Sequence, residues 1–430
     1  MSNRADSPAG IHSEKVENAL LVSISLPDMK AGEAESHLDE LKQLVDTMGL
    51  TTIDSTVVKL KKPSSRYLVG SGKAQELADL AAELEADCII FDDELSPSQQ
   101  RNWETLTELC VIDRHEVILD IFAESAHSRE AALQVGLARM EYSLPRLTRA
   151  WTHLSRQRGG QRGTRGEGET QLEADRRIVV RRIHKYKTEL ARVRSQRETR
   201  RRMRTSVPIP TAAIVGYTNA GKSSLLNALT GADALVEDKL FATLDPTTRR
   251  LPIHNGSEVL LTDTVGFIRK LPHDLVDAFK STLEETVLAD MLIHVLDASN
   301  PEVRHHHETT LAVLDELGAG EKPSLLIFNK TDLPAAALAI GALRNDFPTA
   351  IFVSVHTGDN LDRITQGIKS LLFDTVPVEE YNIPSDRYDI AALIHRTGRV
   401  IQETYEDDLM IIKAQVPPKT RGLCAAFLAK

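Results

Sequence analysis

Residues 216–223 have the types and spacing of a phosphate-binding loop. They are Gly216, Tyr217, Thr218, Asn219, Ala220, Gly221, Lys222 and Ser223, and Ser224 comes next. The glycines let backbone N–H groups approach phosphate oxygens, Lys222 is placed to reach the β- and γ-phosphates, and the Ser223 hydroxyl is a ligand for Mg²⁺. The alternative is a chance glycine-rich turn, but an apolar run precedes the loop and an apolar-periodic segment follows it. We therefore predict a nucleotide site, with Lys222 as a catalytic residue.

A second stretch predicts the metal and γ-phosphate contacts. Asp263, Thr264, Val265 and Gly266 follow the apolar residues 260–262. An aspartate at the end of such a strand holds Mg²⁺ through water. The N–H of Gly266 is placed to sense a γ-phosphate, so we also predict Gly266 as a catalytic residue. The next residue is Phe267, where many GTPases have a water-orienting glutamine. The Phe267 side chain can neither donate nor accept a hydrogen bond, so we expect the protein by itself to hydrolyse its bound nucleoside triphosphate slowly.

Two further stretches indicate guanine as the base. Asn329, Lys330, Thr331 and Asp332 follow the apolar run 324–328, and Ser354, Val355 and His356 follow 351–353. The Asp332 carboxylate is placed to accept hydrogen bonds from N1–H and N2–H₂ of guanine, an edge that adenine lacks. A backbone N–H of the second stretch is placed to meet guanine O6. These motifs occur in the order of a GTP-binding switch domain.

Between the phosphate loop and Asp263 lies a candidate switch segment. It contains Phe241, Ala242, Thr243, Leu244 and Asp245, followed by two more threonines. A switch threonine ligates Mg²⁺ only while the γ-phosphate is present. Spacing by itself leaves Thr243, Thr247 and Thr248 open for this role.

The length and composition indicate a globular protein of two to four domains, and the motifs above make GTP and GDP its expected ligands. The chain has 430 residues, of which 41% are hydrophobic and 27% charged. No apolar run approaches the roughly 18 residues of a membrane span, and residues 1–10 lack the apolar core of a signal peptide. Cys88, Cys110 and Cys424 have no metal-ligand spacing and suit reduced thiols. We expect a monomer in the cytoplasm.

The charge is uneven along the chain and predicts a contact with RNA. Although the net charge is −10, residues 139–204 hold 20 lysines and arginines against 7 acidic residues, a local +13. Two apolar heptad patterns in 133–193 predict a helical hairpin, kinked at Pro145. The loop 157–169 between them has five glycines and the arginines Arg158, Arg162 and Arg165. A solvated loop is the simpler interpretation, but we favour an RNA-contacting tip.

The order of patterns predicts an α/β protein built around a P-loop GTPase domain with a doubly wound, mostly parallel sheet. We expect a disordered tail at 1–14, an N-terminal α/β domain at 15–127, the helical hairpin at 128–205, the GTP-binding domain at 206–375 and a small α+β domain at 376–430. Gly70–Lys73 resembles a degenerate second phosphate loop, and we interpret it as a turn. The histidines 305–307 are expected on a polar helix face.

The motifs resemble those of the HflX family of ribosome-associated GTPases, in the translation-factor-like class. The resemblance covers about residues 15–375, and the matching stretches are 114–122, 166–177, 216–223, 241–249 and 263–268. It implies that Thr243 is the switch threonine, that Mg²⁺ is bound directly by Ser223 and Thr243, and that Asn219 helps to hold K⁺. Val355 stands where the family usually has alanine, but the contact there is made by the backbone.

The resemblance also implies binding to the large ribosomal subunit and its ribosomal RNA, and a role in splitting or rescuing stalled ribosomes. Three alternatives stay open. One is a GTPase of ribosome assembly or tRNA modification, and another is an RNA-remodelling ATPase that uses the N-terminal domain. The third is a passive RNA-binding module with a vestigial nucleotide site, which the intact motifs disfavour.

Overall fold

The computed structural model describes residues 17–147, 171–204, 209–231, 240–241, 243–254, 257–270, 284–374, 376–406 and 408–429. The expected tail 1–14, the three loop arginines Arg158, Arg162 and Arg165, and Ala242 lie outside these ranges. The chain divides into two compact units. The first comprises Met1–Glu124 and Val135–Lys187, and the second comprises Ser125–Gln134 and Thr188–Lys430. No helix in the described ranges is long and apolar enough to cross a membrane.

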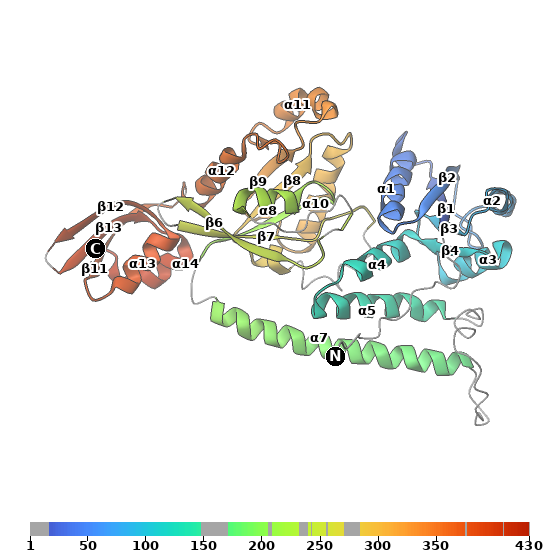
Figure 1. Cartoon of the computed structure of the whole chain (residues 1–430), viewed down its shortest axis with the longest axis horizontal. Helices are drawn as coiled ribbons and strands as arrows, with labels where there is room; N and C mark the ends of the chain where they lie inside the picture. Colours follow the sequence, from blue (N-terminus) through green and yellow to red (C-terminus); the bar gives the residue numbers. More distant parts are fainter. Residues whose placement is uncertain are drawn as a thin grey trace. The chain divides into compact units, whose positions relative to one another are not determined.

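The first unit contains a parallel four-stranded sheet in the order β2-β1-β3-β4 (Figure 1). Its elements are β1 (Asn18–Ser25), α1 (Glu33–Thr47), β2 (Thr51–Lys59), α2 (Ser71–Glu83), β3 (Cys88–Phe91), α3 (Pro97–Thr107), β4 (Cys110–Asp113) and α4 (Arg114–Ser125). Apolar strand residues and Trp103 of α3 form the core. Of the residues 70–73 that were interpreted as a turn, Gly70 is the N-cap of α2 and the other three lie in the helix itself, where Lys73 forms an ion pair with Glu76 at 2.7 Å.

Two helices follow, α5 (Arg129–Ser143) and α7 (Gln171–Arg204) (Figure 1). A Cβ on Gly136 would lie 3.2 Å from the ring of Tyr186, so the glycine allows close packing of the helices at this point. The expected kink at Pro145 is wrong for the described residues. There α5 ends at Ser143, and the proline lies in a 3-10 turn, Leu144–Arg146, where its missing N–H costs no helical hydrogen bond.

The second unit is built on a six-stranded sheet in the order β10-β9-β8-β5-β7-β6. The strands are β5 (Thr211–Gly216), β6 (Thr247–His254), β7 (Ser257–Asp263), β8 (Met291–Asp297), β9 (Ser324–Asn329) and β10 (Ile351–Phe352), all parallel except for the β6–β7 pair. Helices α8 (Lys222–Thr230) and α12 (Leu361–Phe373) pack in one core cluster. Helices α10 (Val303–Glu316) and α11 (Pro334–Asp346) pack in others. The predicted doubly wound, mostly parallel sheet is confirmed.

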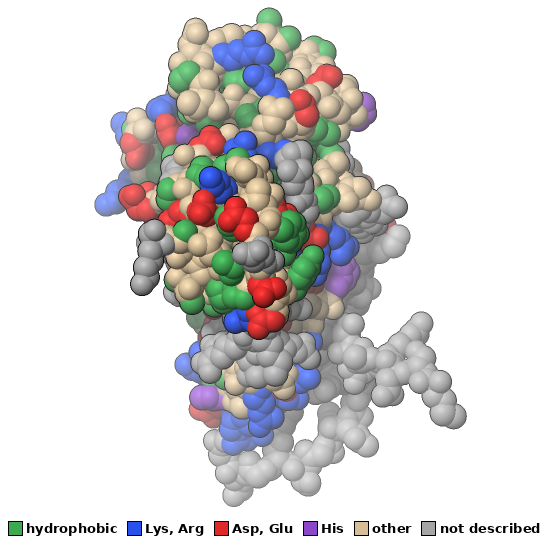
Figure 2. All heavy atoms as spheres, turned by 90° about the vertical axis from the view of Figure 1, so that its left-hand side faces the viewer, with side chains coloured by type: hydrophobic (Ala, Val, Ile, Leu, Met, Phe, Trp, Pro, Cys, Tyr) green, Lys and Arg blue, Asp and Glu red, His purple; other side chains and the backbone are tan. Residues whose placement is uncertain are grey.

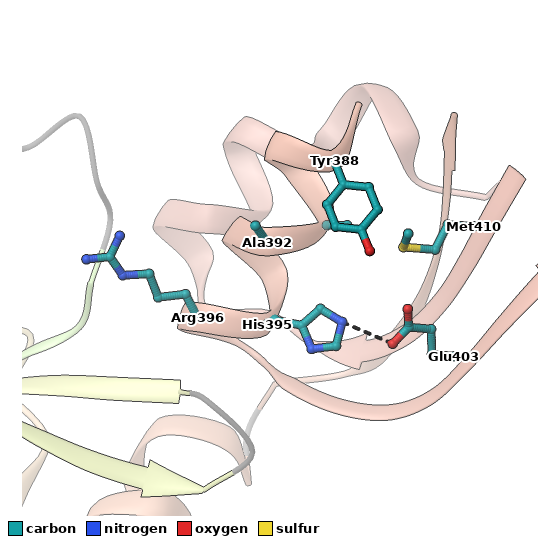
Figure 3. Close-up of a pocket in the computed structure, with 7 residues that line it drawn as sticks. Tyr388, Ala392, His395, Arg396, Glu403 and Met410 are labelled. Carbon is teal, nitrogen blue, oxygen red and sulfur yellow. Dashed lines mark ion pairs between the residues drawn. The ribbon is translucent and has the colours of Figure 1, made fainter. Parts of the chain in front are cut away.

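The last part of the chain forms the predicted small α+β domain. Its antiparallel sheet has the order β11-β13-β12, from β11 (Val378–Pro384), β12 (Arg399–Glu406) and β13 (Leu409–Gln415), and its helices are α13 (Tyr388–Thr397) and α14 (Pro418–Cys424). A depression of about 310 Å³ lies between α13 and the sheet, where His395 and Glu403 form an ion pair at 3.1 Å (Figure 3). On the side of the molecule that Figure 2 shows, apolar side chains and charges of both signs are interspersed, and the described residues there form no basic patch of a single sign.

Candidate nucleotide-binding site

The phosphate loop connects the end of β5 to the start of α8, as the sequence predicts. Gly216 has φ +147°, and a Cβ there would lie 2.1 Å from the carbonyl oxygen of Val295 in β8. Gly221 has φ +91°, and a Cβ there would lie 2.3 Å from the Asn329 side chain. Both glycines are therefore required by neighbouring strands as well as by the turn itself. The loop is held against the strand ends, where ligands bind in open α/β sheets.

Lys222 lies inside the loop and is 7% exposed. Its Nζ donates a hydrogen bond to the carbonyl oxygen of Tyr217 at 2.7 Å. Burial lowers the pKa of Lys222 to about 8, with a further lowering from Lys330 and an opposing effect of Asp263. A desolvated ammonium of this kind gains most from an anionic partner such as a polyphosphate.

Three side-chain oxygens converge beside the loop. The Ser223 hydroxyl donates to Asp263 Oδ2 at 2.5 Å and lies 2.8 Å from the Thr243 hydroxyl. Asp263 is 2% exposed, and burial raises the pKa of its carboxyl. Its Oδ1 is buried and has no hydrogen-bond partner in the described part of the chain. An orphaned carboxylate oxygen beside two hydroxyls fits a hard divalent cation such as Mg²⁺, which prefers oxygen ligands.

Of the three candidate threonines, the structure brings only Thr243 to Ser223 among the described residues. Thr247 and Thr248 belong to β6, and the Thr248 hydroxyl pairs with that of Thr262 in β7 at 3.0 Å. Leu244, next to Thr243, is 1% exposed and anchors the segment in the core.

The residues that follow β7 are joined to the phosphate loop through their backbone. Thr218 N–H donates to the Phe267 carbonyl at 2.8 Å, and Phe267 N–H donates to the Gly216 carbonyl at 3.0 Å. The Phe267 side chain is 1% exposed and packs in an apolar cluster. Gly266 leaves no room for a side chain, because a Cβ there would lie 2.8 Å from Lys222 Nζ. Val265 and Thr264 are buried, and the Thr264 hydroxyl donates to the Ile214 carbonyl at 2.6 Å.

The residues expected around guanine meet at the ends of β9 and β10. The Ser354 hydroxyl donates to Asp332 Oδ1 at 2.6 Å, and this bond is the main reason why the pKa of Asp332 is lowered. His356 lies 3.8 Å from the same carboxylate.

The backbone of the two guanine loops is also joined, because the Thr331 N–H donates to the Val353 carbonyl at 3.2 Å. The Val355 N–H, which the sequence places for guanine O6, donates to Asn329 Oδ1 at 3.1 Å. Lys330, with φ +61°, pairs with Asp297 at 2.9 Å.

The phosphate loop is supported from behind by residues that the sequence patterns did not indicate. The Tyr217 ring stacks on His306 of α10, with centroids 3.7 Å apart and an interplanar angle of 3°. The Tyr217 hydroxyl accepts a hydrogen bond from the Arg269 N–H at 2.8 Å. The expectation of a polar face for 305–307 is therefore wrong for His306, which is 7% exposed. The helical spacing of the buried residues Val303, His306, Thr310 and Leu314 is the signal that would have placed it inside.

The strand–loop–helix phosphate site, the aspartate that ends the adjacent strand and the guanine-contacting loops define a P-loop GTPase. Three family models match the chain. They are described as GTP-binding GTPase N-terminal at residues 35–123, GTP-binding GTPase Middle Region at 125–204, and 50S ribosome-binding GTPase at 211–330.

Curated relatives extend this similarity over almost the whole chain. GTPase HflX of Akkermansia muciniphila is 47% identical over 97% of this chain and 98% of its own. GTPase HflX of Caldanaerobacter subterraneus is 44% identical over 93% and 91%, and that of Escherichia coli is 42% identical over 91% of each chain. The chain belongs to the HflX family of GTPases, as its motifs predicted, and it is a GTP-hydrolysing enzyme.

Proposed function

We propose that this GTPase binds the large ribosomal subunit in its GTP state and uses hydrolysis to leave it, and so splits or rescues stalled ribosomes. The observation that carries the proposal is the convergence of Ser223, Thr243 and Asp263, which allows a segment 20 residues from the loop to respond to the γ-phosphate. The family model over 211–330 is that of a 50S ribosome-binding GTPase, and the basic segment 139–204 suits ribosomal RNA. Such a protein works in the cytoplasm, here as a monomer.

In this proposal Ser223 and Thr243 would hold Mg²⁺ directly, and Asp263 would hold it through water. When bound, the ion neutralises charge on the β- and γ-phosphates. Lys222 contacts the same phosphates, the Gly266 N–H contacts the γ-phosphate, and Asp332 selects guanine. Asn219, which is exposed in the loop with φ +57°, contributes to a K⁺ site.

Hydrolysis by the protein alone is expected to be slow. Phe267 is locked in the core and bonded to the loop backbone, so it supplies no group that orients the attacking water. Turnover is therefore expected to rise when K⁺ replaces Na⁺ and again when ribosomes are added. Fast GTP turnover in Na⁺ that does not change when ribosomes are added would contradict both the K⁺ site at Asn219 and the need for a water-orienting group from the ribosome.

The decisive test of the function is co-sedimentation with mature large subunits, whole ribosomes, precursor particles and free tRNA. Each is mixed with the protein and GDP, or with a non-hydrolysable GTP analogue. We expect retention on mature large subunits with the analogue, and loss of light scattering from whole ribosomes. Preference for precursors or free tRNA would instead support assembly or tRNA modification. ATP hydrolysis that survives Lys222→Ala would support an ATPase in the N-terminal domain.

A further inference from the structure

The carboxylate of Asp245 is bound by a residue far away in sequence. Both of its oxygens are engaged by Ser128, 117 positions earlier: the Ser128 N–H donates to Oδ2 at 2.8 Å, and the Ser128 hydroxyl donates to Oδ1. Ser128 directly precedes α5, in the stretch Ser125–Gln134 that clusters with the GTPase domain. The contact therefore lies within one compact unit.

The start of α5 shows why this contact forms. Ser128 caps the helix, because its hydroxyl accepts the Ala131 N–H at 3.0 Å. In a complete capping box, a Glu or Gln three residues after the cap would bind the N–H of the capping residue. Ala131 has no such group, and Asp245 takes its place. By contrast, α3 has a complete box of its own, in which Ser96 caps the helix and Gln99 binds back to the Ser96 N–H at 2.9 Å.

Asp245 is two residues from Thr243, and the short segment between them is fixed at both ends. At one end the Thr243 hydroxyl lies 2.8 Å from that of Ser223. At the other end Asp245 is held by Ser128. The intervening Leu244 is 1% exposed, so the segment cannot bend outward there without moving this apolar side chain into solvent. A three-residue backbone spans only about 10 Å when extended, so movement at one end is transmitted to the other.

We infer that Asp245 and Ser128 are positioning residues for GTP hydrolysis, which hold the switch segment so that Thr243 meets the metal site. This inference rests on the proposed role of Thr243. It adds that the γ-phosphate state is linked to the cap of α5. By thermodynamic reciprocity, whatever stabilises Thr243 at the metal also stabilises the Ser128 contact. Any change that moves residues 125–134 away from Asp245 therefore weakens GTP binding relative to GDP binding.

The test compares Asp245→Ala, Ser128→Ala, Thr243→Ala and the Asp245→Ala/Thr243→Ala double variant. For each, affinity for a GTP analogue and for GDP is measured with Mg²⁺, together with kcat. We expect Asp245→Ala to lower analogue affinity and kcat by about tenfold, the scale of lost hydrogen bonds to a charged group, with GDP affinity unchanged. Ser128→Ala should have a smaller effect of the same kind, because its N–H remains. In the double variant, Asp245→Ala should cost nothing beyond Thr243→Ala.

Two controls separate the possible failures. Ser96→Ala removes an equivalent cap from α3 and should leave nucleotide preference unchanged, since α3 belongs to the first compact unit and the nucleotide-binding loops belong to the second. Hydrogen exchange should show stronger protection of residues 125–134 with the analogue than with GDP, and Asp245→Ala should abolish the difference. If Thr243→Ala leaves the analogue-to-GDP ratio intact, the proposed switch role fails. If Thr243→Ala lowers this ratio but Asp245→Ala lowers both affinities equally, or neither, the positioning role is overturned.

Discussion

The side-chain amide of Asn329 donates a hydrogen bond to the carbonyl oxygen of Ala220 at 3.0 Å, although 109 residues separate them. The oxygen of the same amide accepts the Val355 N–H at 3.1 Å. One buried side chain thus joins the phosphate loop to the loop after β10. Since these loops are expected to contact opposite ends of the nucleotide, Asn329 sets the distance between the two subsites.

Asn329→Ala is expected to weaken GTP and GDP to the same extent. The substitution leaves two polar partners unsatisfied, which costs about 2 kcal/mol, or roughly a 30-fold loss of affinity. Fluorescent-nucleotide titration measures it. Asn102→Ala is the matched control, because the Asn102 amide also donates to a backbone carbonyl, that of Arg66 at 2.8 Å, in the N-terminal domain. Equal nucleotide affinity in the two variants would contradict the prediction.

Asp332→Asn is expected to change the preferred base. The Ser354 hydroxyl favours the ionised carboxylate of Asp332, which accepts hydrogen bonds but cannot donate them. An amide reverses one donor–acceptor match, so GTP should lose roughly 2–4 kcal/mol while xanthosine triphosphate gains affinity. Competition of the two nucleotides for a fluorescent analogue measures the exchange. Wild-type GTP affinity in the variant would remove the guanine assignment.

His306→Ala is expected to loosen the phosphate loop from behind. The substitution removes the ring that stacks on Tyr217, at a cost of about 1 kcal/mol. We expect a lower thermal midpoint and a loss of GTP affinity of roughly threefold to tenfold. His305→Ala is the control, because His305 is the exposed neighbour on the same helix. A pair of variants with the same midpoint and affinity would show that the stack supports nothing.

The N-terminal domain is expected to lose stability as the pH rises. Burial, together with the nearby Asp113 carboxylate, raises the pKa of Glu116 from 4.5 to about 7. A carboxyl with a raised folded-state pKa contributes most below pH 4.5, and this contribution falls away between pH 4.5 and 7. The loss is on the order of 3 kcal/mol. Glu116→Gln should abolish it and be the more stable form above pH 7.

Urea unfolding from pH 4.5 to 8, followed by tryptophan fluorescence, measures the effect of Glu116, since Trp103 lies in the core of this domain. Parallel stability profiles for wild type and Glu116→Gln would show that Glu116 does not titrate in this range.

The loop arginines stay a prediction from the sequence. Replacing Arg158, Arg162 and Arg165 by alanine is expected to weaken binding to large subunits and to lower its salt dependence by up to about two units of slope, at 0.7–0.9 per lost contact. GTP affinity of the free protein should not change. A control variant replaces the exposed arginines Arg344, Arg363 and Arg399. An equal change of slope in both variants would return the loop to the role of a solvated linker.

Much of the fold follows from local patterns. Buried apolar runs alternate with helical periodicity in 18–125, and this alternation predicts the parallel sheet that is observed. The same approach failed at Pro145, where a heptad pattern was continued through a residue at which the described helix has already ended. It also failed at His306, because residue type outweighed spacing: a histidine was taken as polar surface, whereas its position matches the buried face of α10.

The sequence by itself determined the class of site, because a phosphate loop and a guanine motif each depend on a few consecutive residues between a strand and its next element. The tertiary structure brings Thr243 to Ser223, as the family resemblance implied but spacing could not decide, and it alone decided that His306 supports Tyr217 and that Asp245 completes the cap of α5. These pairs are 20, 89 and 117 positions apart. Periodicity tells which side of an element faces the core but not which distant residue it will meet there. That choice is made by strand order and helix packing.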